Sequence, residues 1–407
     1  MKTRILVVAP YPIKNPMHGG QKRVQALVAR YRELSNEVSF AAVYLNKSYN
    51  EAYKTDIAVT DTSIYEQLSA HPELTDIIAG LAMTEVKEVK STFTTLLKKK
   101  QPDVIHVEQP YMVASVAAIL KEINMKSLII FGSQNVEFEM KRSIFKSVVP
   151  KEALASLVKR TKDIEKRAVE LADVVIAVSN YDLGVLTKHT KFKPRFVIPN
   201  GIEASSSNVA KTNEWLEFKK NEKIKTMATF IGSAHPPNYL GFVKLLAKAK
   251  IPGDTRIVVA GGMSTYISEQ FKGQTEFWNR VSVAGVLSKP SLQALINESD
   301  IILLPILNGG GSNLKTAEAI ISGKKIVATK YAFRGYERYL SLPNIYIANS
   351  EKAFETALTK AIHTSYIRLS SWQKKLAQTV TWPYALVNMK YVVLVSNFLR
   401  FVRSLSF

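Results

Sequence analysis

The segment Asn308–Thr329 reads NGGGSNLKTAEAIISGKKIVAT, and this pattern predicts a glycine-rich loop, a short helix and a strand in succession. It follows the apolar run Ile301–Leu304, which is typical of a buried strand. The helix is predicted to begin near Ser312 or Asn313 and to end at Gly323. Strands and helices that alternate in this way are typical of α/β folds with a parallel sheet.

The glycine loop and the helix start after it predict a binding site for an anionic group. Free N–H groups and the positive end of the helix dipole both point toward such a loop. The backbone of Gly309–Gly311 can approach a phosphate closely because these residues have no Cβ. Lys315 would lie in the first turn within reach of the phosphate, and Glu318 would share its face and could bind ribose hydroxyls. The alternative is a flexible loop with a solvated lysine, since glycine-rich loops are common.

Length and composition limit the classes of protein that this chain fits. Its 407 residues suit two domains of about 200 residues each, and its 46% hydrophobic residues allow two sizeable cores. The absence of cysteine excludes disulfides, thiolate zinc sites and cysteine nucleophiles, and it fits a reducing compartment. The six histidines form no HExxH or HxxxH motif, so we expect no protein-held metal. We expect a cytoplasmic location, with the inner face of the membrane as a second site.

The formal charge of +21 and the pI of about 9.7 favour polyanionic partners. Basic residues are spread along the sequence, with one local run at Lys98–Lys100, and there is no zinc-finger or RNP-like motif. Nucleic acid is therefore not expected as the partner. A phosphorylated ligand or an anionic membrane surface is favoured instead.

Two groups of residues in the first half of the sequence follow predicted strands. Ile5–Ala9 predicts a buried parallel strand, and Gly19–Gly20 precedes the helix after it. Pro102–Gln109 predicts another strand, and His106 and Glu108 share one of its faces near the carboxyl end. Open α/β sheets bind ligands at this edge, so these residues are candidates for catalysis. The alternatives are a simple turn at the glycines and a hydrogen-bonded core histidine.

The alternation of strands and helices restarts after residue 225, which predicts two doubly wound α/β domains. Residues 203–225, with many charges and a run of serines, are typical of a linker or a domain boundary. We expect an N-terminal domain over residues 1–205, a second domain over residues 206–365, and C-terminal helices over residues 366–407 that cross back to the first domain.

The last predicted helix, Tyr384–Val402, is apolar apart from Lys390 and Arg400, and Arg403 follows it. A basic amphipathic helix of this kind can lie on an anionic membrane. The alternative, which we favour, is a helix packed onto the N-terminal domain.

Several short motifs, each weak alone, occur together in the order found in one enzyme family. They are the first strand with Gly19–Gly20, Pro102–Val107, Asn135–Glu137, Ala172–Ser179, Pro199–Ile202, Phe230–Ser233 with Pro237–Asn238, Val283–Val286 and Gly309–Ala319. With these motifs, residues 2–382 resemble glycosyltransferases of family 4, which have the GT-B fold of two Rossmann-like domains facing across a cleft. The resemblance implies transfer of a sugar from a nucleotide-diphosphate sugar to a glycan or lipid-linked acceptor. It also implies retention at the anomeric carbon and no metal or other cofactor.

The resemblance further implies roles for individual residues. The second domain would bind the nucleotide, with Glu318 on the ribose and backbone near Val286 on the base. Gly232 would allow the diphosphate to approach, and Gly20 of the first domain would close over the donor. The diphosphate would be held by Lys315 and by the backbone of Gly310, Gly311, Ser312, Asn313 and Leu314.

Three departures from the family pattern bear on the chemistry. The family often has two glutamates eight residues apart, and Gly310 occupies the first of these positions here. The arginine and lysine that usually follow the strand at Ile231 are absent, which would leave Lys315 as the main side-chain cation on the leaving diphosphate. Glu108 stands where many members have a histidine beside the donor sugar. If the reaction inverts the anomeric carbon, Glu108 or His106 would be the base.

Two other functions fit the same pattern. A nucleotide-sugar epimerase of the same fold would release a changed sugar without any acceptor. A non-catalytic GT-B scaffold would bind polyanions or a partner protein.

Overall fold

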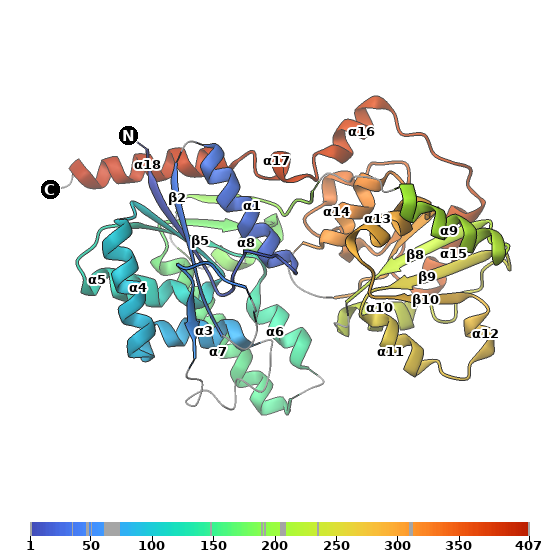
Figure 1. Ribbon diagram of the computed structural model, residues 1–407, viewed down its shortest axis with the longest axis horizontal. Coiled ribbons are helices and arrows are strands. Elements are labelled where there is room, and N and C mark those ends of the chain that lie inside the picture. The colour runs from blue at the N-terminus through green and yellow to red at the C-terminus, as the bar shows by residue number, and fades with distance from the viewer. Residues whose placement is uncertain are drawn as a thin grey trace. The chain divides into compact units, whose positions relative to one another are not determined.

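The computed structural model describes residues 2–34, 36–45, 49, 51–60, 74–146, 149–188, 190, 193–203, 209–233, 236–308 and 312–405 (Figure 1). The chain divides into two compact units. The first comprises Met1–Asn200 together with Ala385–Phe407, and the second comprises Gly201–Tyr384. Each unit contains its own parallel sheet, which confirms the predicted pair of doubly wound α/β domains.

The first unit contains a seven-stranded sheet in the order β3-β2-β1-β4-β5-β6-β7, and all neighbouring strands are parallel. The strands are β1 Arg4–Ala9, β2 Glu37–Leu45, β3 Ile57–Val59, β4 Val104–Glu108, β5 Leu128–Gly132, β6 Val174–Ala177 and β7 Arg195–Val197. Strands β5 and β6 are almost entirely apolar because helices cover both faces of the sheet.

The helices of the first unit pack on both sides of this sheet. They are α1 Gly19–Glu33, α3 Thr75–Glu85, α4 Lys87–Lys100, α5 Val113–Glu122, α6 Glu137–Phe145, α7 Lys151–Leu171, α8 Asn180–Thr187 and α18 Met389–Leu405. One core joins strand residues such as Leu6 and Ile105 to Ile78 of α3, Phe93 of α4 and Val169 of α7.

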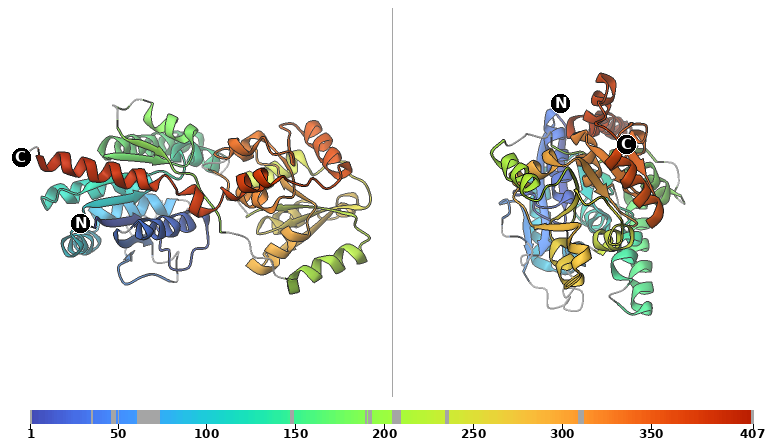
Figure 2. Two further views of the ribbon diagram at one scale, coloured as in Figure 1. Left: turned by 90° about the horizontal axis from the view of Figure 1, so that it is seen from above. Right: turned by 90° about the vertical axis from the view of Figure 1, so that its right-hand side faces the viewer.

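The C-terminal helix α18 belongs to the first unit. Val393 of α18 lines a small internal gap together with Ile5 of β1 and Tyr31 of α1, so α18 covers the sheet face that α1 also covers. Figure 2 shows α18, in red, lying along this sheet. The helix therefore packs onto the N-terminal domain, which is the alternative that the sequence favoured.

The second unit contains a six-stranded parallel sheet in the order β10-β9-β8-β11-β12-β13. Its strands are β8 Thr226–Ile231, β9 Thr255–Ala260, β10 Val281–Gly285, β11 Ile301–Leu304, β12 Lys325–Ala328 and β13 Ile345–Ile347. Its helices are α9 Val209–Asn221, α10 Pro236–Leu245, α11 Met263–Gln270, α12 Thr275–Trp278, α13 Lys289–Glu298, α14 Leu314–Ser322, α15 Glu351–His363 and α16 Ser371–Gln378, and α17 Trp382–Ala385 follows.

Of the two alternatives predicted for residues 203–225, a linker or a domain boundary, the linker is wrong for most of the segment, because Val209–Asn221 forms helix α9. Trp215 and Phe218 of this helix pack against Ile224 and Leu295 of the second unit. Two aromatic residues three positions apart lie on one face of a helix, and the charged residues around them obscured that apolar face in the sequence.

The chain passes between the units at positions that differ from the expected boundaries at residues 205 and 365. It leaves the first unit after Asn200 and returns at Ala385. Residues 366–384 stay with the second unit because Ile202 pairs with this segment. Its N–H donates to the carbonyl of Val380 at 3.0 Å, and its carbonyl accepts from the N–H of Trp382 at 3.1 Å.

Each sheet has one point at which the strand order reverses direction. In the first unit this point lies between β1 and β4, and in the second it lies between β8 and β11. Parallel sheets of this type bind ligands outside the carboxyl ends of the two strands at such a point. Lys315 and Glu318 come after β11, and His106 and Glu108 lie toward the carboxyl end of β4, so the topology of each unit places these residues at its ligand-binding edge.

Candidate functional site

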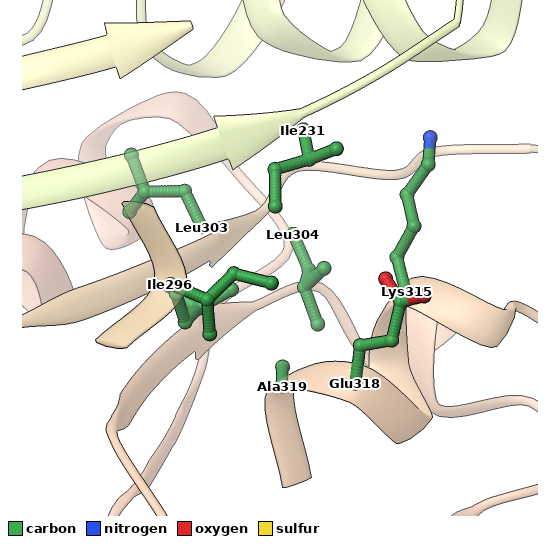
Figure 3. A pocket seen from close by; sticks show the side chains of 8 residues that line it. Ile231, Ile296, Leu303, Leu304, Lys315, Glu318 and Ala319 are labelled. Atoms are coloured by element: carbon green, nitrogen blue, oxygen red, sulfur yellow. The ribbon is translucent and has the colours of Figure 1, made fainter. Parts of the chain in front are cut away.

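A small pocket lies where β8, β11 and α14 meet in the second unit. Figure 3 shows the side chains that line it. They are Ile231 at the end of β8, Ile302, Leu303 and Leu304 of β11, Ile296 of α13, and Lys315, Glu318 and Ala319 of α14. The walls are apolar, and Lys315 and Glu318 are the charged side chains among the lining residues. A mostly apolar pocket with a few polar groups is typical of a small-molecule site.

Helix α14 begins close to where the sequence predicted. Asn313 is its N-cap and accepts a hydrogen bond from the backbone N–H of Lys315 at 3.3 Å. Gly323 ends the helix with a φ of 67°, a conformation that glycine adopts without strain. Ser312 is buried beside the helix start. The glycine loop itself, with the predicted site residues Gly310 and Gly311, lies outside the described residues.

Lys315 is held by hydrogen bonding to a neutral side chain. Its Nζ donates to Oδ1 of Asn238 at 2.7 Å and lies 5.8 Å from the centre of the Phe230 ring. Asn238 is buried, and its own Nδ2 donates to the backbone oxygen and the Oγ of Ser233 at 3.0 and 3.1 Å. The amide is thereby fixed with its oxygen toward the lysine, which positions the ammonium at the end of β8.

Burial lowers the pKa of Lys315 to about 8, although the carboxylate of Glu318 acts in the opposite direction. An ammonium group loses hydration when it is enclosed, and a hydrogen bond to an amide oxygen restores only part of that stabilisation. A dianionic ligand beside Lys315 would supply the charge that this environment lacks. Glu318, one turn further along α14, is partly exposed and lines the same pocket.

Gly232 follows β8 directly and packs closely against α11. A Cβ at this position would lie 2.4 Å from Sδ of Met263, so a larger residue would require the Met263 side chain to move. Gly261, with a φ of 96°, would bring its Cβ to 2.3 Å from the oxygen of Gly232. Packing within the protein is therefore enough to explain why glycine occupies positions 232 and 261, and no ligand needs to be invoked. Val286, the residue expected near the base, follows β10 and is 83% exposed.

The candidate residues of the first unit belong to one buried network at the ends of β1 and β4. Arg23 of α1 donates from Nε to Oε2 of Glu108 at 3.3 Å, and Nε2 of His106 lies 3.1 Å from Oε1 of the same carboxylate. The hydroxyl of Tyr31 lies 2.8 Å from Nδ1 of His106. Gln134 donates to Oε2 of Glu108 at 2.7 Å. Both carboxylate oxygens of Glu108 are therefore bonded within the protein.

Burial alone would raise the pKa of Glu108, but Arg23, His106 and Gln134 outweigh it and the pKa is lowered. The side chains of Glu108 and His106 are 0% exposed, and that of Arg23 is 1% exposed. A carboxylate held in this way remains ionised and is closed to solvent. Its role as a base stays a prediction, and the geometry matches the hydrogen-bonded core alternative for His106.

Gly20 is joined to this network by close packing. A Cβ at Gly20 would lie 2.5 Å from the hydroxyl of Tyr11 and 2.7 Å from Oε1 of Gln134. Gln134 also donates to the Tyr11 hydroxyl at 2.6 Å, in addition to its bond to Glu108. The start of helix α1 is thus positioned by the residues that surround Glu108.

Arg23, Gln134 and Asn238 are site residues that sequence reasoning missed. Arg23 could have been predicted from the sequence, because it lies next to Val24 on the buried face of α1. A buried arginine side chain requires a partner of opposite charge or a hydrogen-bond acceptor. Asn238 lies in the motif Pro237–Asn238, but its contact with Lys315 joins residues 77 positions apart and could not be predicted from the sequence. Within the parts of the chain that the structure describes, no group of three or more His, Asp or Glu residues is arranged to hold a metal ion.

Comparison with known families gives two matches that lie in succession along the chain. The model for Glycosyltransferase Family 4 matches residues 19–206, and the model for Glycosyl transferases group 1 matches residues 225–363. No curated protein matches the sequence. The two family models together cover most of both units.

Solved structures with the same fold cover nearly the whole chain. Sucrose-phosphate synthase from Thermosynechococcus elongatus has a TM-score of 0.69 and 14% identity, over 96% of this chain and 98% of its own. HepE from Anabaena, in complex with UDP, has a TM-score of 0.66 and 13% identity, over 98% and 100%. A glycosyltransferase from Rickettsia africae has a TM-score of 0.65 and 16% identity, over 98% and 99%.

The two parallel sheets match the GT-B fold of these structures, and both family models describe glycosyltransferases. The resemblance to family 4 that the sequence motifs indicate is thereby confirmed. The chain belongs to the group 1 glycosyltransferases of family 4, enzymes with the GT-B fold.

Proposed function

We propose that the donor of this glycosyltransferase is a nucleotide-diphosphate sugar and that the second unit binds its nucleotide. The observation that carries the proposal is the placement of Lys315 by Asn238 at the start of α14, beside Glu318 and the pocket at the end of β8 and β11. The same topological position holds nucleotides in doubly wound sheets in general. Structures of similar fold contain UDP or UDP-glucose in HepE and ADP in starch synthase IV from Arabidopsis thaliana, which supports this donor class.

Each predicted residue has a role in this proposal. Glu318 accepts hydrogen bonds from the ribose hydroxyls, and the exposed backbone at Val286 meets the base. Lys315 and the N–H groups at the start of α14 hold the diphosphate. The backbone of Gly310, Gly311, Ser312, Asn313 and Leu314 supplies those N–H groups. Gly232 keeps the end of β8 open to the diphosphate, and the role expected for Gly20 stays a prediction.

The chemistry follows from the charges that develop during sugar transfer. Positive charge builds at the anomeric carbon while negative charge builds on the departing diphosphate. Lys315 and the helix N-terminus stabilise that negative charge without a metal ion, because both are fixed before the bond breaks. We propose retention of configuration, in which the leaving phosphate oxygen accepts the acceptor's proton and no strong protein base is needed.

Glu108 and His106 have a supporting role in this mechanism. A base must reach the proton that it removes, and both side chains are enclosed and bonded to protein groups. We assign them to positioning the start of α1 and Gly20, through Gln134 and Tyr11. An inverting reaction would require the Arg23–Glu108 ion pair to open first.

The acceptor is proposed to be a glycan or a lipid-linked glycan, used on the cytoplasmic side of a membrane. The basic charge of the chain supports an acceptor that carries phosphate or lies at an anionic surface. The proposed acceptor does not depend on the proposed donor site, and it is tested by the reactions with and without a lipid-linked acceptor described below.

The proposal is tested by product analysis with UDP-, GDP-, ADP- and dTDP-sugars, each with and without a lipid-linked acceptor and with and without EDTA. We expect sugars of one of the four nucleotides to be cleaved with release of the nucleoside diphosphate. The rate of release should rise when acceptor is added and should not change with EDTA. NMR of the product should show the anomeric configuration of the donor. Release of a changed sugar without acceptor would identify an epimerase, and inverted product would return Glu108 and His106 to consideration as bases.

A further inference from the structure

Helix α18 of the first unit has two apolar faces. Its inward face packs on the sheet through Met389 and Val392, both 0% exposed, and Ser396, which is 2% exposed. Its outward face carries Tyr391, Leu394, Phe398, Phe401 and Leu405, which are 48%, 62%, 63%, 59% and 67% exposed. These five residues recur every three or four positions. At about 100° per residue they form a stripe opposite the buried residues.

Polar contacts fix which face of α18 points outward. The Oγ1 of Thr3, just before β1, donates to Asn397 at 2.8 Å. Arg400 pairs with Asp103, just before β4, at 2.7 Å, and Arg403 pairs with Asp173, just before β6. The helix is therefore tied to the amino ends of the three strands β1, β4 and β6. Rotation that would bury the outward stripe would break these contacts.

An exposed row of large apolar side chains requires a covering partner, because a soluble surface rarely keeps such a row in water. Residues 385–407 of the printed sequence contain no Asp or Glu, and of their three basic residues Arg400 and Arg403 pair with aspartates while Lys390 is directed to the stripe. Lys390 stands beside the stripe, with its Nζ 4.9 Å from the centre of the Tyr391 ring. An apolar stripe flanked by positive charge is complementary to an anionic lipid surface.

We propose that the outward face of α18 is a membrane-contact surface that inserts its apolar side chains among anionic lipids. The segment Trp382–Leu405 is also long and apolar enough for a membrane-spanning helix, by length and composition alone. The ties to the first unit make α18 lie on the membrane rather than cross it.

The test is co-sedimentation of the full chain with vesicles of phosphatidylcholine, with and without phosphatidylglycerol. We expect binding to vesicles that contain phosphatidylglycerol and a decrease at high salt. The variant Leu394→Ser/Phe398→Ser/Phe401→Ser should partition at least about tenfold less. Leu216→Ser, which changes a residue 48% exposed on α9, is the matched control and should bind as the wild type does. The charge component is tested with Lys390→Glu, which should weaken binding to anionic vesicles.

Two further measurements keep the proposal open to contradiction. Melting curves of the triple variant should match those of the wild type, since the three side chains face outward. In Phe398→Trp, the new indole should move its emission to shorter wavelength when vesicles are added. The proposal is overturned if vesicles do not bind, if the triple variant binds equally, or if neutral vesicles bind as well as anionic ones. It is also overturned if light scattering shows a lipid-free dimer that the triple variant separates, because the stripe spacing also suits a helix of a second copy.

Discussion

The Nζ of Lys315 lies 2.7 Å from Oδ1 of Asn238, so the cation at the start of α14 is held by an uncharged partner that is itself fixed by Ser233. A neutral partner positions the ammonium and leaves most of its charge available for a ligand. An aspartate in the same place would neutralise it and repel a diphosphate. This contact is the structural basis for the predictions about the second unit.

The first prediction concerns pH. The protonated form of Lys315 binds the diphosphate, and burial places its pKa at about 8. Nucleotide affinity should therefore fall as the pH rises through about 8, because the free enzyme loses this proton there and a bound diphosphate would have to restore it. In Lys315→Arg the guanidinium stays charged, so the decline should disappear while binding remains. Calorimetry across this pH range measures the effect, and an equal decline in the arginine variant would contradict it.

The second prediction concerns Asn238. Asn238→Asp should lower nucleotide affinity near neutral pH and move the decline of the affinity to higher pH, because a carboxylate raises the pKa of Lys315. Asn238→Ala should weaken binding less. Asn238→Ala should not change nucleotide affinity further in a protein that already carries Lys315→Ala. Residues in contact typically show an interaction energy of about 0.5–3 kcal/mol in a double-mutant cycle. Ser233→Ala, which removes one of the two bonds to Nδ2 of Asn238, is the mild control. Additive effects of the Asn238 and Lys315 substitutions would show that the contact has no role in binding.

The third prediction concerns ribose recognition. Glu318→Ala should weaken binding of the preferred nucleoside diphosphate by about tenfold or more, as expected for a lost hydrogen bond to a charged group. The same variant should lose the wild type's discrimination against the analogue that lacks the ribose 2′ and 3′ hydroxyls. The measurement is the affinity of the wild type and of Glu318→Ala for the nucleoside diphosphate and for its analogue without the two hydroxyls. If the variant keeps the discrimination, another residue binds the ribose.

The fourth prediction concerns the buried pair Arg23–Glu108. Glu108→Gln should reduce the free energy of unfolding of the first unit by about 3–5 kcal/mol, because it leaves a buried guanidinium without its counter-ion. Glu122→Gln, which breaks the exposed pair with Lys90, should cost about 1 kcal/mol or less. Circular dichroism in urea measures these changes. All four tryptophans lie in the second unit, so tryptophan emission should report an unchanged transition there.

The stabilisation from Glu108 also has a defined pH dependence. Its pKa in the folded state is lower than in the unfolded chain. The contribution to stability is therefore fully present above the ordinary carboxyl pKa and is lost as the pH falls through the folded value. A Glu108→Gln protein that is as stable as the wild type at neutral pH would contradict the structural role and reopen the catalytic one.

The sequence predicted most of the fold because its signals are local. The continuous apolar run of Ile301–Leu304, the N-cap at Asn313 and the glycine at Gly323 each act within a few residues, and the structure has β11 and α14 at these positions. Helix α9 was missed because its apolar face consists of few residues among many charges. The return of the chain at Ala385 was also missed, since it depends on pairing between Ile202 and Val380, which are far apart in sequence.

In the candidate site, too, the residues with local sequence signals were predicted and their partners from distant parts of the chain were not. Lys315 and Glu318 were found from the loop and helix pattern, and the structure brings them to one pocket. The partners that define their chemistry come from other elements, as Asn238 does for Lys315. His106 and Glu108 were found as a pair on one strand, but the sequence could not show that Arg23 and Gln134 enclose them. Spacing identifies residues that share a face, and only packing determines whether that face is open.

The central claim is that a nucleoside diphosphate binds at Lys315 in the second unit. Calorimetric titration of the wild type, Lys315→Ala and the exposed control Lys244→Ala with UDP, GDP, ADP and dTDP tests it most directly. We predict that one of the four nucleotides binds the wild type and Lys244→Ala equally, and binds Lys315→Ala at least about tenfold more weakly. Binding to Lys315→Ala with wild-type affinity, or no binding of any of the four to the wild type, would contradict the account.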